Sequence, residues 1–245
     1  MDLRDCRVGA ERGEAIARAV HELGEGRLVV LPTDTVYGIA AGAHLPMAVR
    51  SLLRAKGRSR AKPPPVLVAD TEQATGLVDR FSPAAQALVA ALWPGPLTLV
   101  ARVAAGIRWD LGDADGTVAI RVPDHGIARA LLRASGPLAV SSANVAGEPP
   151  ALTAHEAVAA FRDAVALYLD AGPAPGGLPS TVVDVTGREL RILRSGAIGA
   201  DRIATVVGRA PVAGRPVAIG LRDRSTRRGV AAGQLASAAN GADGP

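Results

Sequence analysis

The chain has 245 residues, of which 48% are hydrophobic and 2% aromatic, and its formal net charge is +5. This length allows one large domain or two small ones, with a core built from aliphatic side chains. The single cysteine, Cys6, excludes an internal disulfide framework and a multi-cysteine zinc site, and we expect an inert thiol near a loose terminus. No apolar run reaches the roughly 18 residues that span a bilayer, and the charged N-terminus lacks the apolar segment of a signal peptide. A cytoplasmic location without membrane association is therefore expected.

Apolar periodicity predicts a succession of helices and buried strands along the chain. Helices are expected over residues 11–23, 46–56, 71–78, 82–92, 126–134, 153–161 and 203–207. Strands are expected over residues 28–31, 66–69, 97–103, 117–123, 138–140, 165–170, 180–185 and 190–194. Ser82 before Pro83, and Thr153 three residues before Glu156, are typical of helix N-termini, so two of the helices have well-defined expected starts.

The composition changes after residue 210. From residue 211 onward Ala, Gly and Arg dominate without an ordered apolar pattern, and the segment carries five arginines and two aspartates. We therefore expect a folded domain over residues 1–210 and a disordered tail over residues 211–245. The moderately basic body fits polyanionic ligands such as nucleotides, but it does not demand nucleic acid.

Short polar side chains lie beside several predicted strands. They occur as Thr-Asp-Thr at 33–35, Ser-Ser-Ala-Asn at 141–144 and Ser-Thr at 180–181. In the alternating segment 117–123, Thr117 and Arg121 would share one face and could serve one site. Each group taken alone is more typical of a turn. Together they predict a site rich in hydrogen bonds for a small polar ligand.

The densest basic cluster of the body follows the second predicted helix. Lys56, Arg58, Arg60 and Lys62 place four cations within seven residues, and three prolines follow them. Several cations on a stiff loop suit a triphosphate, which needs more than one positive charge. The alternative is a solvated basic helix C-terminus, which the helix dipole favours.

The familiar catalytic motifs are missing from the sequence. No pair of histidines has metal-ligand spacing, so no metal site is predicted, and there is no nucleophile elbow, Walker A sequence or dinucleotide-binding glycine motif. His125 is interpreted either as a base or, with more weight, as the cap of the next helix. A site with cations and hydroxyls but no obvious nucleophile suits phosphoryl or nucleotidyl transfer, where positioning and charge neutralisation dominate.

Seven segments of the chain occur in the order found in one known family. They are PTDTVYG, KGR, WPGPLT, VAIRVPDH, SSAN, PSTVVD and LRSGAI, and they cover residues 28–198. With them the chain resembles the YrdC-like threonylcarbamoyl-adenylate synthases of the single-domain bacterial type. The resemblance implies an α/β fold with a twisted mixed sheet flanked by helices and a positively charged concave face. It also implies a nucleotidyltransferase that makes threonylcarbamoyl-AMP and pyrophosphate from L-threonine, bicarbonate and ATP, for the threonylcarbamoyladenosine modification of tRNA.

The same resemblance implies a role for individual residues of this sequence. Lys56 and Arg58 correspond to the catalytic basic pair. The positions implied for ATP are Arg58, Lys62, Thr117, Asn144 and Arg194, and those implied for threonine are Thr35, Arg121, Ser142 and Ser180. Mg²⁺ would accompany ATP, no protein metal ligand is implied, and the product would be handed to a tRNA threonylcarbamoyl-transferase complex.

Two departures from the family pattern and two alternative functions stay open at this point. Leu67 stands about where many relatives have a histidine, and residues 147–152 lack the Ser and Thr residues that many relatives have there. One alternative is an RNA-binding or ribosome-maturation protein that uses the same basic concave surface, although aromatic stacking residues are nearly absent. The other is a relative that uses carbamoyl phosphate, against which the short chain argues.

Overall fold

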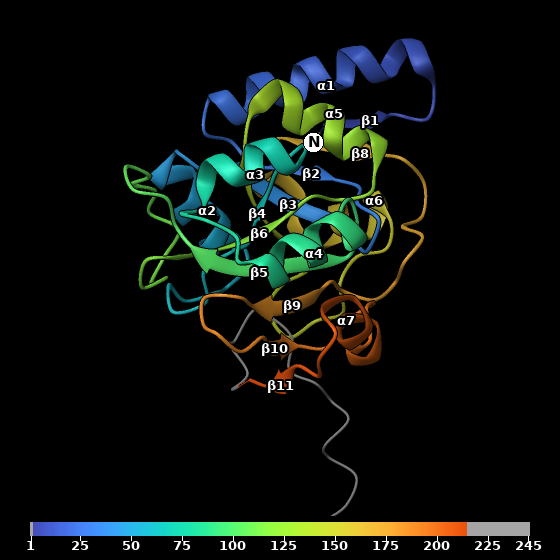
Figure 1. Ribbon diagram of the computed structural model, residues 1–245. Helices are drawn as coiled ribbons and strands as arrows, with labels where there is room; N and C mark the ends of the chain where they lie inside the picture. The colour runs from blue at the N-terminus through green and yellow to red at the C-terminus, as the bar shows by residue number, and fades with distance from the viewer. Residues whose placement is uncertain (1, 215–245) are drawn as a thin grey trace, which may run out of the picture.

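An eleven-stranded mixed sheet is the frame of the molecule (Figure 1). The computed structural model describes residues 2–214. In spatial order the strands are β1, β8, β2, β3, β7, β4, β6, β5, β9, β10 and β11. Their bounds are β1 Asp2–Asp5, β2 Val29–Leu31, β3 Gly38–Gly42, β4 Val66–Leu67, β5 Leu97–Arg102, β6 Thr117–Arg121, β7 Leu138–Ser142, β8 Leu167–Asp170, β9 Thr181–Asp184, β10 Arg191–Arg194 and β11 Val212–Ala213. The sheet contains parallel pairs such as β5–β9 and antiparallel pairs such as β3–β7, which confirms the mixed α/β sheet.

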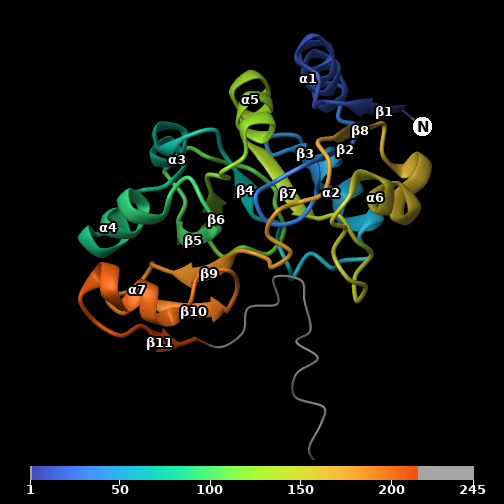
Figure 2. The same cartoon turned by 90° about the vertical axis from the view of Figure 1, so that its right-hand side faces the viewer.

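Seven α-helices of the described residues pack around this sheet (Figure 2). They are α1 Gly9–Gly24, α2 Pro46–Ala55, α3 Thr71–Leu77, α4 Pro83–Leu92, α5 Gly126–Ser135, α6 Ala154–Phe161 and α7 Ala200–Val207, with a 3₁₀ turn at Arg162–Ala164. The two predicted caps are confirmed, because Ser82 Oγ accepts from Ala85 N at 3.3 Å and Thr153 Oγ1 accepts from Glu156 N at 3.1 Å. None of the described helices is long and apolar enough to cross a membrane.

The interior consists of three apolar clusters that lie against different parts of the sheet. One joins α3, α4 and α7 to strands β5, β6 and β9, another joins α1 and α5 to the β2–β8 end, and the third lies under α2 and α6. Aliphatic residues dominate all three clusters, as the composition predicts. The polar loops at the strand ends are therefore carried by rigid, buried strands rather than by mobile segments.

Three features at the two ends of the chain differ from the predictions. The charged segment Asp2–Asp5 forms β1, which pairs in parallel with β8. Cys6 is fully buried, and its backbone N–H donates to Asp170 O at 2.7 Å, so the thiol lies in the core and not at a loose terminus. Burial raises the pKa of this thiol to about 11. Val212–Ala213, at the start of the predicted tail, pairs in parallel with β10, while residues 215–245 lie outside the described part of the chain.

Candidate active site

One pocket gathers the polar strand ends that the sequence singles out. Among the predicted site residues, those that line it are Thr35, Arg58, Arg121, Ser142, Ser180 and Arg194. They come from loops and strands spread over 160 positions of the sequence. The mixed sheet brings them together because β2, β7, β6 and β9 all have an end at this place.

The Thr-Asp-Thr loop after β2 is held in shape by its own hydroxyls. Thr33 Oγ1 donates to Val36 O at 2.6 Å and lies 3.0 Å from Thr35 Oγ1. Both threonines are almost fully buried. Pro32 ends the strand. The threonine hydroxyls then form hydrogen bonds with backbone groups of the loop, which would otherwise be buried without partners. Thr35 is thereby presented to the pocket in a fixed orientation.

Arg121, the last residue of β6, joins this loop to the neighbouring segment. Its Nη2 donates to Asp34 Oδ1 at 2.5 Å, its Nη1 to Thr35 Oγ1 at 3.0 Å and its Nε to Gly95 O at 3.0 Å. The side chain is buried, and burial lowers the pKa of Arg121, although the Asp34 carboxylate opposes that shift. Asp34 does not neutralise the whole pocket, because two further arginines face it.

Arg58 and Arg194 bring a second and a third guanidinium to the pocket. Arg58 Nη1 donates to Ser141 Oγ at 3.2 Å, and Arg194 Nη2 donates to Ser180 O at 2.7 Å and Ser180 Oγ at 2.9 Å. Burial lowers the pKa of each to about 10, and for Arg194 the positive charges of Arg121 and Arg58 add to the shift. The charges of Arg121 and Arg58 therefore act on Arg194 across the pocket, and an anionic ligand between the three guanidiniums would offset this repulsion.

Thr98 belongs to the site although the sequence analysis did not select it, and so does Ser141, which was selected only as part of the Ser-Ser-Ala-Asn group. Thr98 Oγ1 lies 2.8 Å from Ser180 Oγ in the buried wall of the pocket, and Ser141 accepts from Arg58. A signal for Thr98 was present, since it is the polar residue between the apolar positions Leu97 and Leu99 of a strand. Alternation alone could not show that β5 pairs with β9, which places Thr98 beside Ser180.

Lys56 and Asn144 lie behind the pocket instead of lining it. The Lys56 ammonium donates to Ser142 O at 2.5 Å, to Asn144 Oδ1 at 3.0 Å and to Asn144 O. Burial, and secondarily the charge of Arg58, lowers the pKa of Lys56 to about 7. Asn144 Nδ2 donates to Val145 O at 3.0 Å and Glu148 O at 2.7 Å, so its amide shapes its own loop. These contacts attach Lys56 and Asn144 to the Ser142 loop, and the direct roles implied for the two residues stay predictions.

Two other predicted residues are not brought into the pocket. Thr117, at the opposite end of β6 from Arg121, donates to Ala114 O at 2.6 Å and lines a separate, largely apolar cavity with Leu77 and Trp109. Thr117 and Arg121 therefore lie at opposite ends of β6, with their side chains roughly 13 Å apart, and the expectation that they serve one site stays a prediction. Lys62 is half-buried outside the pocket lining, and its backbone N–H closes a turn on Ser59 O.

Leu67 and His125 also differ from simple expectations. Leu67 is buried, pairs in register with Arg121 and lines the pocket, so it provides an apolar wall beside the guanidinium. His125 occupies the N-cap position of α5, but its side chain makes no capping hydrogen bond and its buried Nδ1 has no partner in the described part of the chain. The cap interpretation is therefore confirmed for the position of His125 and wrong for its side chain. Burial lowers the pKa of this imidazole.

The described residues do not form a resident metal site. Within residues 2–214 there is no group of three or more His, Cys, Asp or Glu side chains that could hold a metal ion. At the pocket, the Asp34 carboxylate is engaged by Arg121. A divalent cation would therefore have to arrive with most of its ligands supplied by another molecule, such as a polyphosphate.

The fold and the site together define a class of protein. A mixed α/β sheet holds a pocket in which one buried and two half-buried arginines face serine and threonine hydroxyls, which is suited to an anionic substrate and a small polar one. The family model for Sua5, YciO and YrdC proteins, described as "Telomere recombination", matches residues 21–196. The chain belongs to this family.

Individual proteins similar to this chain make the family assignment more specific. A Mycobacterium tuberculosis protein named "Putative threonylcarbamoyl-AMP synthase" is 48% identical over 204 residues, which cover 83% of this chain and 94% of that protein. The threonylcarbamoyl-AMP synthase of Bacillus subtilis is 37% identical over 79% of this chain and 56% of its own length. The crystal structure of Pyrococcus abyssi Sua5 complexed with L-threonine is similar with a TM-score of 0.82 at 33% identity, covering 86% of this chain and 62% of that one.

Proposed function

We propose that this protein is an L-threonylcarbamoyladenylate synthase, a nucleotidyltransferase that converts L-threonine, bicarbonate and ATP into threonylcarbamoyl-AMP and pyrophosphate. The relatives that match over most of the chain carry the name of this activity, and a related structure holds L-threonine. The product would serve the threonylcarbamoyladenosine modification of tRNA. Hand-over to a tRNA threonylcarbamoyl-transferase complex, and a cytoplasmic location, are part of the proposal.

The observation that carries the proposal is the convergence of Arg58, Arg121 and Arg194 on one pocket. Arg121 is buried and pairs with the Asp34 carboxylate, and Arg58 and Arg194 are half-buried in the same pocket. A positive, partly desolvated pocket is what the polyphosphate of ATP requires. The hydroxyls of Thr35, Ser142 and Ser180 provide hydrogen-bonding partners for a hydroxylated amino acid beside it.

The chemistry can be written without a covalent enzyme intermediate. The threonine amine adds to carbon dioxide derived from bicarbonate and loses a proton, which gives a carbamate. A carbamate oxygen attacks the α-phosphorus of ATP. The bond between the α-phosphorus and the oxygen that bridges it to the β-phosphorus breaks, and pyrophosphate leaves. The reaction needs positioning and charge neutralisation more than a nucleophilic side chain.

The roles of the residues follow from their places in the pocket. Arg58 and Arg194 neutralise charge that develops on the phosphates, because preorganised buried cations act without the cost of reorienting water. Arg121 and Thr35 form the threonine side of the pocket, together with Ser142 and Ser180. Lys56 acts through the loop of Ser142. Mg²⁺ would accompany ATP and, when bound, would supply further neutralisation of the phosphate charge, with no residue of this chain assigned as its ligand.

The deciding experiment is pyrophosphate release from ATP, with magnesium and bicarbonate, in the presence and absence of L-threonine. The proposal expects release that requires threonine and bicarbonate and that falls when serine replaces threonine. A folded sample that binds ATP but shows no threonine-dependent release would contradict the proposal. Steeply salt-dependent RNA binding in such a sample would favour the RNA-binding alternative.

A further inference from the structure

The segment that joins β8 to β9 crosses most of the sheet. Six strands lie between β8 and β9, so a flat sheet would separate the two by about 34 Å. The chain from residue 170 to residue 181 can span at most about 40 Å when fully extended. We call residues 171–179 the strap. Its short length leaves little slack, so that points of attachment along it determine where it runs (Figure 2).

The strap forms the wall of the pocket beside Thr35. Gly177 N donates to Thr35 O at 2.9 Å, and Pro179 lines the pocket next to Ser180. Gly176 lies so close to the Thr-Asp-Thr loop that a Cβ atom there would be 2.6 Å from Asp34 O. A small displacement of the strap would therefore change the space and the hydrogen bonding around Thr35.

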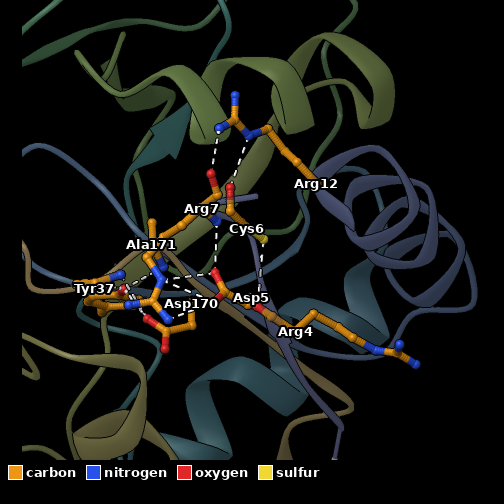
Figure 3. A network of polar contacts seen from close by, with 9 residues as sticks. Arg4, Asp5, Cys6, Arg7, Arg12, Tyr37, Asp170 and Ala171 are labelled. Carbon is orange, nitrogen blue, oxygen red and sulfur yellow. Dashed lines mark hydrogen bonds and ion pairs between the residues drawn. The ribbon is translucent and has the colours of Figure 1, made fainter. Parts of the chain in front are cut away.

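Tyr37 attaches the start of the strap (Figure 3). Its hydroxyl donates to Gly172 O at 2.6 Å and accepts from Ala171 N at 3.1 Å, while Asp170 Oδ1 accepts from Gly172 N at 2.8 Å. The ring is fully buried, and burial raises the pKa of the hydroxyl to about 12, so that it keeps its proton at neutral pH.

The backbone of Tyr37 is fixed at the same time to the opposite wall of the pocket. Tyr37 N donates to Ala151 O at 3.0 Å, and Ala143 N donates to Tyr37 O at 2.8 Å. One residue thus connects the strap to the loop that carries Ser142. The proposed binding and catalytic steps do not use the Tyr37 side chain, although Tyr37 lies in the same loop region as Thr35.

We propose that Tyr37 is a positioning residue for the amino-acid substrate, because its hydroxyl holds the strap in place as the wall of the pocket. This inference rests on the proposed function. The predicted consequence is selective: loss of the hydroxyl loosens the threonine side, where the strap meets Thr35, and leaves Arg58 on the ATP side in place.

The test compares the variants Tyr37→Phe and Tyr168→Phe in the full chain. Tyr168 is the matched control, since it is also fully buried and its hydroxyl also donates to a backbone carbonyl at 2.6 Å, but that carbonyl belongs to Arg162, which is not a residue of the strap. In Tyr37→Phe we expect the KM for threonine to rise about tenfold, the effect of unpairing buried backbone groups. The KM for ATP and kcat should stay within about threefold, and Tyr168→Phe should leave all three parameters within about threefold.

A second variant tests the same wall of the pocket in case Tyr37→Phe does not fold. Gly176→Ala acts at the far part of the strap, at an exposed position, where its Cβ would push against Asp34 O. It should raise the KM for threonine in the same selective way. Faster hydrogen exchange of Ala171, Gly172 and Gly177 amides in Tyr37→Phe is expected as an independent readout.

The outcomes separate the two proposals. If the wild-type protein shows no threonine-dependent pyrophosphate release, the proposed function is overturned. The proposal that Tyr37 positions threonine is then overturned with it. An active wild type whose KM for threonine is unchanged in both strap variants overturns only the positioning role. An equal rise in Tyr168→Phe would also overturn it, because the effect would then come from general loosening of the core.

Discussion

Arg58 and Arg60 are separated by one residue in the same basic segment, yet they belong to two different electrostatic regions. Arg58 turns into the pocket, where burial lowers its pKa to about 10. Arg60 is about half exposed and pairs with Asp110 at 2.6 Å and Asp113 at 3.6 Å, and the hydrogen bond to Asp110 raises its pKa. The first guanidinium faces other cations, whereas the second is neutralised by carboxylates.

This contrast shows that the number of cations in a segment does not determine its field at a ligand. Water and counterions screen the charge of an exposed arginine, and a nearby carboxylate cancels much of the rest. The charge of a buried arginine acts on its neighbours across a medium of lower dielectric constant. The charges of Arg121 and Arg58, for example, contribute to lowering the pKa of Arg194. Changes in the pocket should therefore have large effects, and similar changes on the surface small ones.

The largest effect on stability is expected for Arg121→Ala. The variant leaves the Asp34 carboxylate buried without its partner, which typically costs about 3–5 kcal/mol in the free energy of unfolding. Urea unfolding measures this loss. The double variant Arg121→Ala/Asp34→Ala should recover part of it, and a single variant as stable as the wild type would show that Asp34 finds water or another donor.

The largest effect on turnover without loss of folding is expected for Arg58→Ala. Removing one preorganised cation should lower threonine-dependent pyrophosphate release by about 100-fold. Arg60→Ala is the matched control from the same segment and should keep release within about twofold, since Arg60 faces Asp110. Equal losses in the two variants would mean that the whole segment, and not the buried arginine, contributes to turnover.

Lys56 predicts a pH dependence of stability. Its pKa is about 7 in the folded protein and about 10.4 in an unfolded chain, so between these values the unfolded state holds the extra proton. Stability relative to Lys56→Met should therefore rise with pH above about 7, by roughly 1 kcal/mol per pH unit, and stay constant below it. Urea unfolding of both proteins between pH 6 and pH 9 measures the difference, and a flat difference would indicate that Lys56 stays charged throughout.

The smallest effects should distinguish a buried hydroxyl from an exposed one. Thr98→Val removes the 2.8 Å hydrogen bond to Ser180 inside the pocket wall and should cost about 1 kcal/mol of stability. Thr205→Val removes an exposed hydroxyl that donates to Asp201 O, and thermal unfolding should show a change of less than about 0.5 kcal/mol. Comparable losses of stability in the two variants would mean that burial does not increase the contribution of the pocket hydroxyl to stability.

Much of the local structure followed from the sequence because it depends on short-range chemistry. Ser82 and Thr153 cap helices as predicted, since a cap is formed within three residues. Most of the buried strands were predicted from apolar runs. Gly38–Gly42 and Asp2–Asp5 were not predicted as strands, because one is rich in small residues and the other in charge, and both form through pairing with distant partners.

The composition of the candidate site was also readable from the sequence, but its geometry was not. Polar residues at strand ends identified Thr35, Ser142 and Ser180, which the pocket does bring together. The period of a strand tells which residues share a face, yet it cannot tell which end meets a ligand, and so Thr117 and Arg121 separate. Likewise, four cations in one segment are set by sequence, whereas burial and distant partners decide that Arg58 enters the pocket, Lys56 supports a loop and Arg60 faces solvent.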